Sequence, residues 1–140
     1  MTMDPDRPGS PQPLPTYAGL RVLLAEDEPM ATKLAQGALK VMGITDIVAV
    51  RDGEQALAVL EREQGQFQLI VSDWNMPNMS GLDFLKAVRR RFPHMKFVML
   101  TGKATREFVV AAKQHGVDAY VVKPFSPNQL RRKIEALFTL

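Results

Sequence analysis

Acidic, hydroxyl and ammonium side chains follow four short apolar runs of this sequence, and together they could carry out phosphoryl transfer. Glu26 and Asp27 come directly after the first run, Asp73 ends the third, Thr101 follows the fourth, and Lys123 ends the fifth. A carboxylate such as Asp73 can attack phosphorus as a nucleophile and form an aspartyl phosphate. A hydroxyl and an ammonium group can then hold the phosphoryl oxygens.

The three carboxylates also predict a divalent metal site. Two carboxylates about 4 Å apart repel by roughly 4 kcal/mol at an effective dielectric of 20, so three together require raised pKa values or a cation. A ligand set made only of oxygens favours a hard ion, and a small exposed site that keeps several waters favours Mg²⁺ over Ca²⁺. The chain has no cysteine, and His94 and His115 form no ligand pattern.

Each of these residues also has a simple structural interpretation when it is taken singly. An acid in a turn can accept local N–H groups, a threonine can end a strand, and a lysine can extend from a sheet edge into water. Only the combination at the ends of four strands favours a site.

The apolar runs predict strands, which alternate with stretches of helical periodicity. The predicted strands are 21–25, 46–50, 67–73, 96–100 and 119–123, and the predicted helices are 30–42, 54–64, 82–91, 104–115 and one that begins after an N-cap at Ser126. Gly43, Gly65 and Gly116 are expected to end three of these helices. The alternation predicts one open, doubly wound parallel sheet with helices on both faces, since five units are too few for an eight-stranded barrel.

Composition predicts one soluble cytoplasmic domain at 19–140, preceded by a disordered, proline-rich leader at 1–18 that holds five of the ten prolines. No apolar run is long enough to span a membrane or form a signal core, and the absence of cysteine suits a reducing compartment. The net charge of +3 is weak support for nucleic-acid binding. Two basic runs, 89–91 and 131–133, are interpreted as a solvated helix end and an exposed helix face.

Three stretches carry a resemblance to a known family: Leu24-Ala25-Glu26-Asp27, the loop from Ser72 to Leu82, and Val121-Val122-Lys123-Pro124-Phe125. Because of the combination and spacing of these three stretches, the chain resembles the receiver domains of two-component response regulators. The resemblance runs from about Leu20 to Leu140. It is most similar to the single-domain chemotaxis regulators of that family. The resemblance implies a flavodoxin-like fold with strand order 2-1-3-4-5, an order that periodicity alone does not provide.

The resemblance also implies roles for the acidic residues. Asp73 would be the phosphoacceptor, and Asp27, Asp73 and the backbone carbonyl of Asn75 would be Mg²⁺ ligands. Glu26 would hold a metal-bound water. Many relatives have aspartate at the position of Glu26, so the added methylene is expected to alter how that water is held without abolishing metal binding.

The same resemblance assigns the phosphate-sensing residues. Thr101 and Lys123 would contact the phosphoryl group, and the Lys123–Pro124 bond is expected to be cis. Tyr120 matches the aromatic switch position, which turns inward when Thr101 engages phosphate; its alternative is an aromatic ring that packs on a strand.

Two further departures from the family pattern lie in loops. Gly102 and Lys103 follow Thr101, and the second ammonium could change the lifetime of the phosphate in either direction. Ser80 replaces a common aspartate and is interpreted as turn chemistry without functional consequence.

The expected function is that of a stand-alone, monomeric receiver, not an enzyme acting on other substrates. A histidine kinase would phosphorylate it with Mg²⁺, and it would assist its own phosphorylation and dephosphorylation. Its output would be protein binding, with the flagellar motor switch protein as the first candidate partner. Alternatives are a phosphate sink or phosphorelay receiver, a fragment of a larger regulator, a Mg²⁺-dependent aspartyl phosphatase, and a nucleic-acid binder. The phosphatase pattern needs a second acid two residues after Asp73, where this chain has Asn75.

Overall fold

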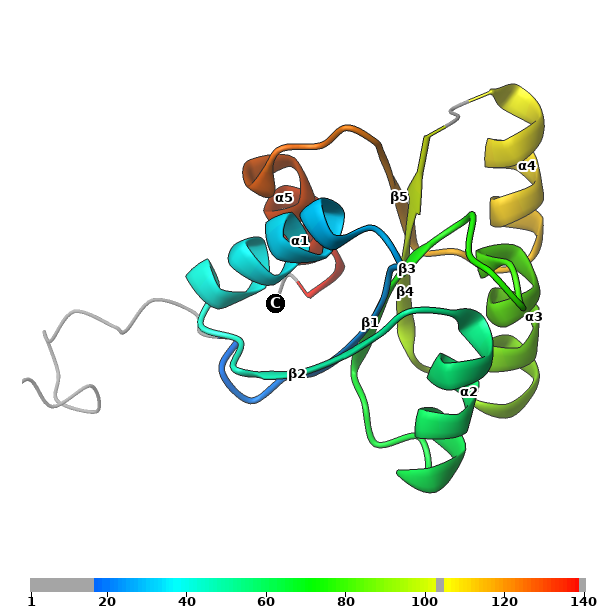
Figure 1. The fold of residues 1–140 in the computed structure, drawn as a ribbon, viewed down its shortest axis with the longest axis horizontal. Coiled ribbons are helices and arrows are strands. Elements are labelled where there is room, and N and C mark those ends of the chain that lie inside the picture. Colours follow the sequence, from blue (N-terminus) through cyan, green and yellow to red (C-terminus); the bar gives the residue numbers. More distant parts are fainter. Residues whose placement is uncertain (1–16, 103–104, 139–140) are drawn as a thin grey trace, which may run out of the picture.

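A computed structural model describes residues 17–102 and 105–138, which form one parallel sheet between two layers of helices (Figure 1). The strand order is β2-β1-β3-β4-β5, as predicted. The strands are β1 (Arg21–Ala25), β2 (Asp46–Val50), β3 (Leu69–Asp73), β4 (Lys96–Thr101) and β5 (Ala119–Val122); the helices are α1 (Pro29–Val41), α2 (Gly53–Arg62), α3 (Gly81–Arg91), α4 (Arg106–Gln114) and α5 (Pro127–Leu137). Of the leader predicted at 1–18, residues 1–16 lie outside the described residues.

The two faces of the sheet bury separate hydrophobic cores because side chains alternate along each strand. In β1, Val22 and Leu24 pack on the side of α1 and α5, while Leu23 and Ala25 pack on the side of α2, α3 and α4. All five residues of β3 are buried, as expected for a central strand with helices on both faces. The strand that ends in Asp73 is therefore fixed from both sides.

Local sequence signals determine where the helices begin and end. Gly43, Gly65 and Gly116 have φ values of 88°, 70° and 90°, a region that glycine adopts without strain. The hydroxyl of Ser126 accepts a hydrogen bond from the backbone N–H of Gln129, which completes a capping box. No helix within the described parts of the chain is long and apolar enough to cross a bilayer.

Several predicted boundaries and one predicted core face differ from the structure. β3 begins at Leu69 instead of residue 67, and α2 ends at Arg62 instead of residue 64. β5 ends at Val122, so Lys123 lies just beyond the strand, and α4 begins at Arg106. On α4, Ala112 is buried, whereas Phe108 and Ala111 are only partly covered. α4 lies beside the edge strand β5 (Figure 1), so no other helix among the described residues covers its outer side.

The prediction of a solvated basic run at the end of α3 is wrong for Arg89. Its guanidinium donates to the backbone oxygens of Gly116 and Met95 at 2.9 and 2.6 Å, and it forms an ion pair of 2.8 Å with Asp118. The Asp118 carboxylate also accepts from the backbone N–H of Phe97 at 2.7 Å. Arg89 thus ties α3 to the segments that precede β4 and β5.

Candidate functional site

The parallel register brings the predicted site residues to one edge of the sheet. Ala25 pairs with Ser72, so Glu26 follows β1 beside the end of β3. Asp73 pairs with Leu100, which places Thr101 one residue beyond it on β4. Parallel strands end at the same side of a sheet, and ligands gather there.

Glu26, Asp27 and Asp73 form a cluster of carboxylates at this edge. One oxygen from each of the three lies within 4.8 Å of the others. Glu26 and Asp73 are only 2% and 5% exposed, whereas Asp27 is half-buried. Two of the three negative charges are therefore held largely away from water, where their mutual repulsion is weakly screened.

The ammonium group of Lys123 lies among these carboxylates. Its Nζ is 2.7 Å from Oε1 of Glu26, 3.4 Å from Oδ2 of Asp73 and 3.5 Å from Oε2 of Glu28. The Lys123–Pro124 peptide bond is cis, and the backbone N–H of Lys123 donates to the carbonyl of Thr101 at 2.7 Å. The contact of Glu28 with Lys123 was not predicted from the sequence, although Glu28 directly follows Glu26 and Asp27.

The pKa values of Glu26 and Lys123 are both raised at this site. Burial raises the pKa of Glu26, and hydrogen bonds from Lys123 and the backbone N–H of Glu28 only partly offset this. Burial alone would lower the pKa of Lys123, but its hydrogen bond with Glu26 and the charges of Asp73, Glu26 and Glu28 together raise it. The lysine is therefore a fixed positive charge at this site at neutral pH.

The loop after Asp73 leaves no room for a side chain at Gly81. The backbone N–H of Gly81 donates to the carbonyl of Trp74 at 2.7 Å. A Cβ atom at Gly81 would lie 2.1 Å from the carbonyl oxygen of Asp73. Ser80 caps α3 by accepting from the backbone N–H of Asp83 at 3.1 Å, which agrees with its interpretation as turn chemistry.

A hydrogen bond between Asp52 and Asn78 also holds this loop, and it was not predicted from the sequence. One carboxylate oxygen of Asp52 accepts from the backbone N–H of Gln55 at 2.8 Å, and the other accepts from the side-chain amide of Asn78 at 2.9 Å. The first of these bonds is the main reason that the pKa of Asp52 is lowered. Asn78 has a φ of 69°, and an asparagine in a loop is the signal that could have suggested this conformation.

Thr101 and Tyr120 lie together on the α4 side of the sheet. Both line a narrow internal gap with Trp74 and Phe108. The ring of Trp74 packs edge-on against Phe108 at 4.9 Å between centroids, and Nζ of Lys133 lies 5.7 Å from the centre of the Tyr120 ring. Thr101 therefore connects the edge that carries Asp73 with the aromatic side chains under α4.

Asn75 and Gly102 lie at the rim of an open depression. Asp73 and Lys123 form part of its lining, and the remaining wall comes from the first turns of α1 and from the segment around Phe125. Asn75 is exposed, so its backbone and side chain are accessible to a ligand in the depression. Lys103 lies outside the described residues.

The donor set at this edge fits a hard divalent cation. Glu26, Asp73 and Glu28 contact the ammonium group of Lys123, and Asp27 completes the carboxylate cluster. Among the described residues, carboxylates therefore outnumber ammonium groups at this site. The raised pKa of Glu26 shows that its ionised form is destabilised there, and a bound cation would relieve that cost. Glu26, Asp27 and Asp73 are the described residues that could hold it.

The sequence matches the family of response regulator receiver domains over residues 22–135. The chain belongs to this family. It is 38% identical over 121 residues to the chemotaxis protein CheY of Pseudomonas aeruginosa, covering 85% of this chain and 96% of that protein. It is 34% identical to CheY-3 of Vibrio cholerae, covering 85% and 92% of the two proteins.

Solved structures agree with this assignment of the receiver domain. The fold is similar to that of the chemotaxis response regulator CheY4 of Vibrio cholerae, with a TM-score of 0.76, 30% identity, and coverage of 85% of this chain and 98% of that one. A CheY-like receiver domain protein from Methanospirillum hungatei gives the same TM-score at 29% identity, covering 84% and 92% of the two chains. The receiver domain is thus homologous to CheY chemotaxis regulators along most of its length.

Proposed function

We propose that Asp73 of this receiver domain accepts a phosphoryl group and that the added charge switches a protein-binding surface. The observation that carries the proposal is the contact of one ammonium group, Lys123 Nζ, with two buried carboxylates, Glu26 and Asp73, at the carboxyl ends of the strands. An acid kept beside a fixed cation has its counter-charge in place before a phosphoryl group arrives.

The reaction forms a bond between a carboxylate oxygen of Asp73 and phosphorus. The bond from phosphorus to the donor breaks, and the donor leaves as a histidine imidazole or, with acetyl phosphate, as acetate. Lys123 holds one phosphoryl oxygen with its ammonium group, and Thr101 donates a hydroxyl to another. Bound Mg²⁺ would supply positive charge that reduces the repulsion between the carboxylate and the phosphoryl oxygens. Glu26, Asp27, Asp73 and the backbone carbonyl of Asn75 would hold it.

The signal then passes through Thr101 and Tyr120 to α4, β5 and α5. When Thr101 moves toward the phosphoryl group, the gap that it shares with Tyr120 and Trp74 changes shape, and the tyrosine ring can turn inward. Moving such a two-state surface from mostly off to mostly on takes about 5.5 kcal/mol of differential stabilisation. One phosphoryl group contacted by Lys123 and Thr101 is a sufficient source.

The relatives of this chain support a place in chemotaxis. Three of the four relatives compared above are named chemotaxis proteins, and this chain covers nearly the whole length of those three. We therefore propose that the chain is cytoplasmic and that a histidine kinase is its phosphodonor. Protein binding is the proposed output, with the flagellar motor switch protein as the first partner to test. A monomer that binds no nucleic acid and acts on no other substrate fits this role.

Trp74 offers a direct test, because it is the single tryptophan of the chain and its ring lines the same gap as Thr101 and Tyr120. Fluorescence should change when Mg²⁺ is titrated, and change again when acetyl phosphate is added. The Asp73→Asn variant should lose the second change. A signal that responds to neither addition would contradict an active receiver.

A further inference from the structure

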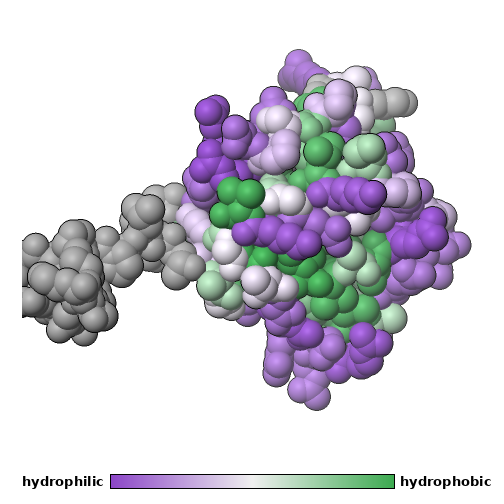
Figure 2. All heavy atoms as spheres, turned by 60° about the vertical axis from the view of Figure 1, so that its left-hand side comes forward, coloured by the Kyte–Doolittle hydropathy of each residue, from purple (hydrophilic) through white to green (hydrophobic). Residues whose placement is uncertain are grey.

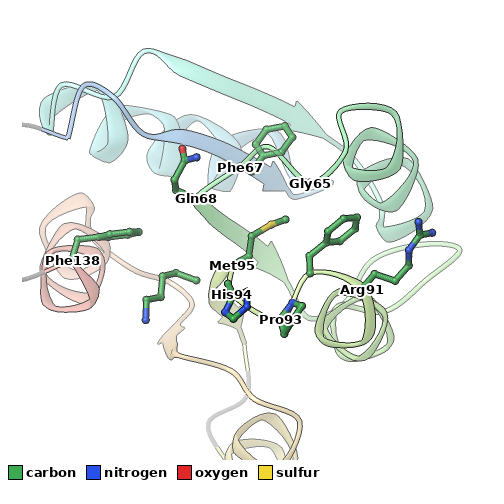
Figure 3. A pocket seen from close by; sticks show the side chains of 10 residues that line it. Gly65, Phe67, Gln68, Arg91, Pro93, His94, Met95 and Phe138 are labelled. Carbon is green, nitrogen blue, oxygen red and sulfur yellow. The ribbon is translucent and has the colours of Figure 1, made fainter.

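A groove at the opposite end of the sheet from the acid cluster has no role in the proposed phosphorylation. It runs beside the amino ends of the strands, between the segment 65–68, the connection 91–96 and Phe138 after α5 (Figure 3). The groove is open to solvent and has a volume of about 410 Å³. In Figure 3, Phe138 lies at one end, Arg91 at the other, and Met95 between them.

The groove is lined mainly by apolar and aromatic side chains. Phe67 and Met95 are only 4% and 6% exposed and form its floor, while Phe92 and Phe138 are partly buried and stand beside them. Pro93 is exposed at the rim. An open groove with aromatic walls is the surface on which proline-rich segments in the polyproline II conformation bind.

The first described residues of the chain already lie against the wall of this groove. The Tyr17 ring packs edge-on against Phe138 at 6.5 Å between centroids. The guanidinium of Arg21 lies 4.4 Å from the centre of the Phe67 ring, and the side-chain oxygen of Gln68 accepts from the backbone N–H of Arg21 at 2.7 Å. The described chain therefore begins beside the groove. The face drawn in Figure 2 carries hydrophobic patches among hydrophilic side chains.

The composition of residues 1–16 suits this groove. Proline occupies positions 5, 8, 11, 13 and 15, and Leu14 adds an apolar side chain beside Tyr17. A polyproline II segment needs no hydrogen bonds of its own and rises about 3.1 Å per residue, so the six residues 11–16 would span about 19 Å. Asp4 and Asp6 carry charge opposite to that of Arg91 and Lys96 at the groove.

We propose that residues 1–16 dock in this groove of the same chain, with the stretch Pro11–Pro15 against Phe138 and the neighbouring aromatic rings. The segment lacks the periodic apolar side chains needed for a core of its own, but polyproline II binding requires only a preformed groove. A short tether gives an effective concentration in the millimolar range, so contacts too weak to hold a free peptide are sufficient here.

The absence of cysteine allows a clean test with a single nitroxide label at Gln12→Cys. Two sets of amides on opposite sides of β1 are compared. Asp46 lies on β2, where it pairs with Arg21 of β1, whereas His94 and Lys96 line the groove on the other side. A docked leader should remove most of the amide peak intensity of His94 and Lys96. A contact of millimolar affinity is occupied for a large part of the time at this effective concentration, and its fast exchange carries the broadening to every molecule. Thr45 and Asp46 should be much less affected.

The labelled chain with Pro11, Pro13 and Pro15 all changed to Ser is the matched control. These substitutions lie outside the described fold, and they should remove the selective loss at His94 and Lys96. Equal broadening on both sides of β1, or selective broadening that survives the serine changes, would overturn the proposal. An isotope-labelled chain without nitroxide, mixed with an unlabelled chain that carries it, tests the second-copy alternative. Groove broadening in that mixture would assign the groove to another molecule and also overturn the proposal.

Discussion

At the scale of single residues, Lys123 holds the position of a counter-ion among carboxylates that a metal would also bind. Its Nζ lies 2.7 Å from Glu26 and 3.4 Å from Asp73, so its positive charge opposes a second cation at the same oxygens. The lysine has two effects of opposite sign, because it helps to hold a phosphoryl group and competes with Mg²⁺.

Replacing Lys123 with Met should therefore tighten Mg²⁺ binding while it slows phosphorylation. We expect about a tenfold lower dissociation constant, equivalent to about 1.4 kcal/mol, measured by Trp74 fluorescence. Lys86→Met is the matched control, because Lys86 pairs with Asp83 on the exposed face of α3, and it should leave the constant unchanged. Weaker Mg²⁺ binding in Lys123→Met would contradict this role.

Gly81 lies in a crowded backbone beside Asp73, and Gly37 is an uncrowded glycine that serves as its matched control. Gly81→Ala should lower the free energy of unfolding by about 3 kcal/mol, because its Cβ would lie 2.1 Å from a backbone oxygen. Gly37→Ala, with no atom within 4 Å in the middle of α1, should raise it by about 0.8 kcal/mol. Urea denaturation of the two variants measures both values. Equal effects of the two substitutions would show that the loop after Asp73 can relax.

At the scale of elements, the connections between strands and helices position the site, and Asp52 joins two of them. It caps α2 and holds Asn78 in the loop that follows β3. The lowered pKa of Asp52 means that its ionised form is stabilised by folding. That contribution is present above the pKa of the unfolded carboxyl, near 3.8, and is lost as pH falls through the lower folded value.

Asp52→Asn should reduce the free energy of unfolding by about 1 kcal/mol at pH 7. The amide can replace only one of the two accepting oxygens, so either Gln55 or Asn78 loses its partner. The difference from the parent chain should shrink as pH falls below about 4, because Asp52 is protonated first in the unfolded chain and, at lower pH, in the folded chain. Urea titrations between pH 3 and 7 measure it, and a difference that stays constant with pH would contradict the assignment.

The sequence allowed the elements to be predicted because each one follows a local rule. Apolar runs, helix-ending glycines and the Ser126 cap locate strands and helices to within about two residues. The strand order came from family resemblance. The ties of Arg89 to Asp118 and of Asp52 to Asn78 could not be predicted, because they join side chains 29 and 26 residues apart. Charged residues in basic or turn-like runs have no periodicity that indicates a distant partner.

At the scale of the whole molecule, the two ends of the sheet are chemically distinct. The carboxyl end collects the acids and Lys123, and the amino end carries the aromatic groove. Any ligand that binds only the folded chain stabilises the whole domain. Metal binding at one edge is therefore measurable as global stability.

Mg²⁺ should raise the free energy of unfolding by about 2.7 kcal/mol at a concentration one hundred times its dissociation constant. The gain should be much smaller in Asp27→Asn, which removes one carboxylate from the cluster, and unchanged in Asp46→Asn, whose partner Arg21 lies at the other end of β1. Chemical denaturation at several Mg²⁺ concentrations measures these gains. An equal gain in Asp27→Asn would place the metal elsewhere.

The most direct measurement of the central claim is the amount of acid-labile phosphate that the chain gains from acetyl phosphate and Mg²⁺. One phosphoryl group per molecule is expected on the parent chain and on Asp83→Asn, which alters an exposed acid on α3. None is expected on Asp73→Asn, and little on the parent chain without Mg²⁺. Phosphate on Asp73→Asn at the level of the parent chain would contradict the assignment of Asp73 as the phosphoacceptor.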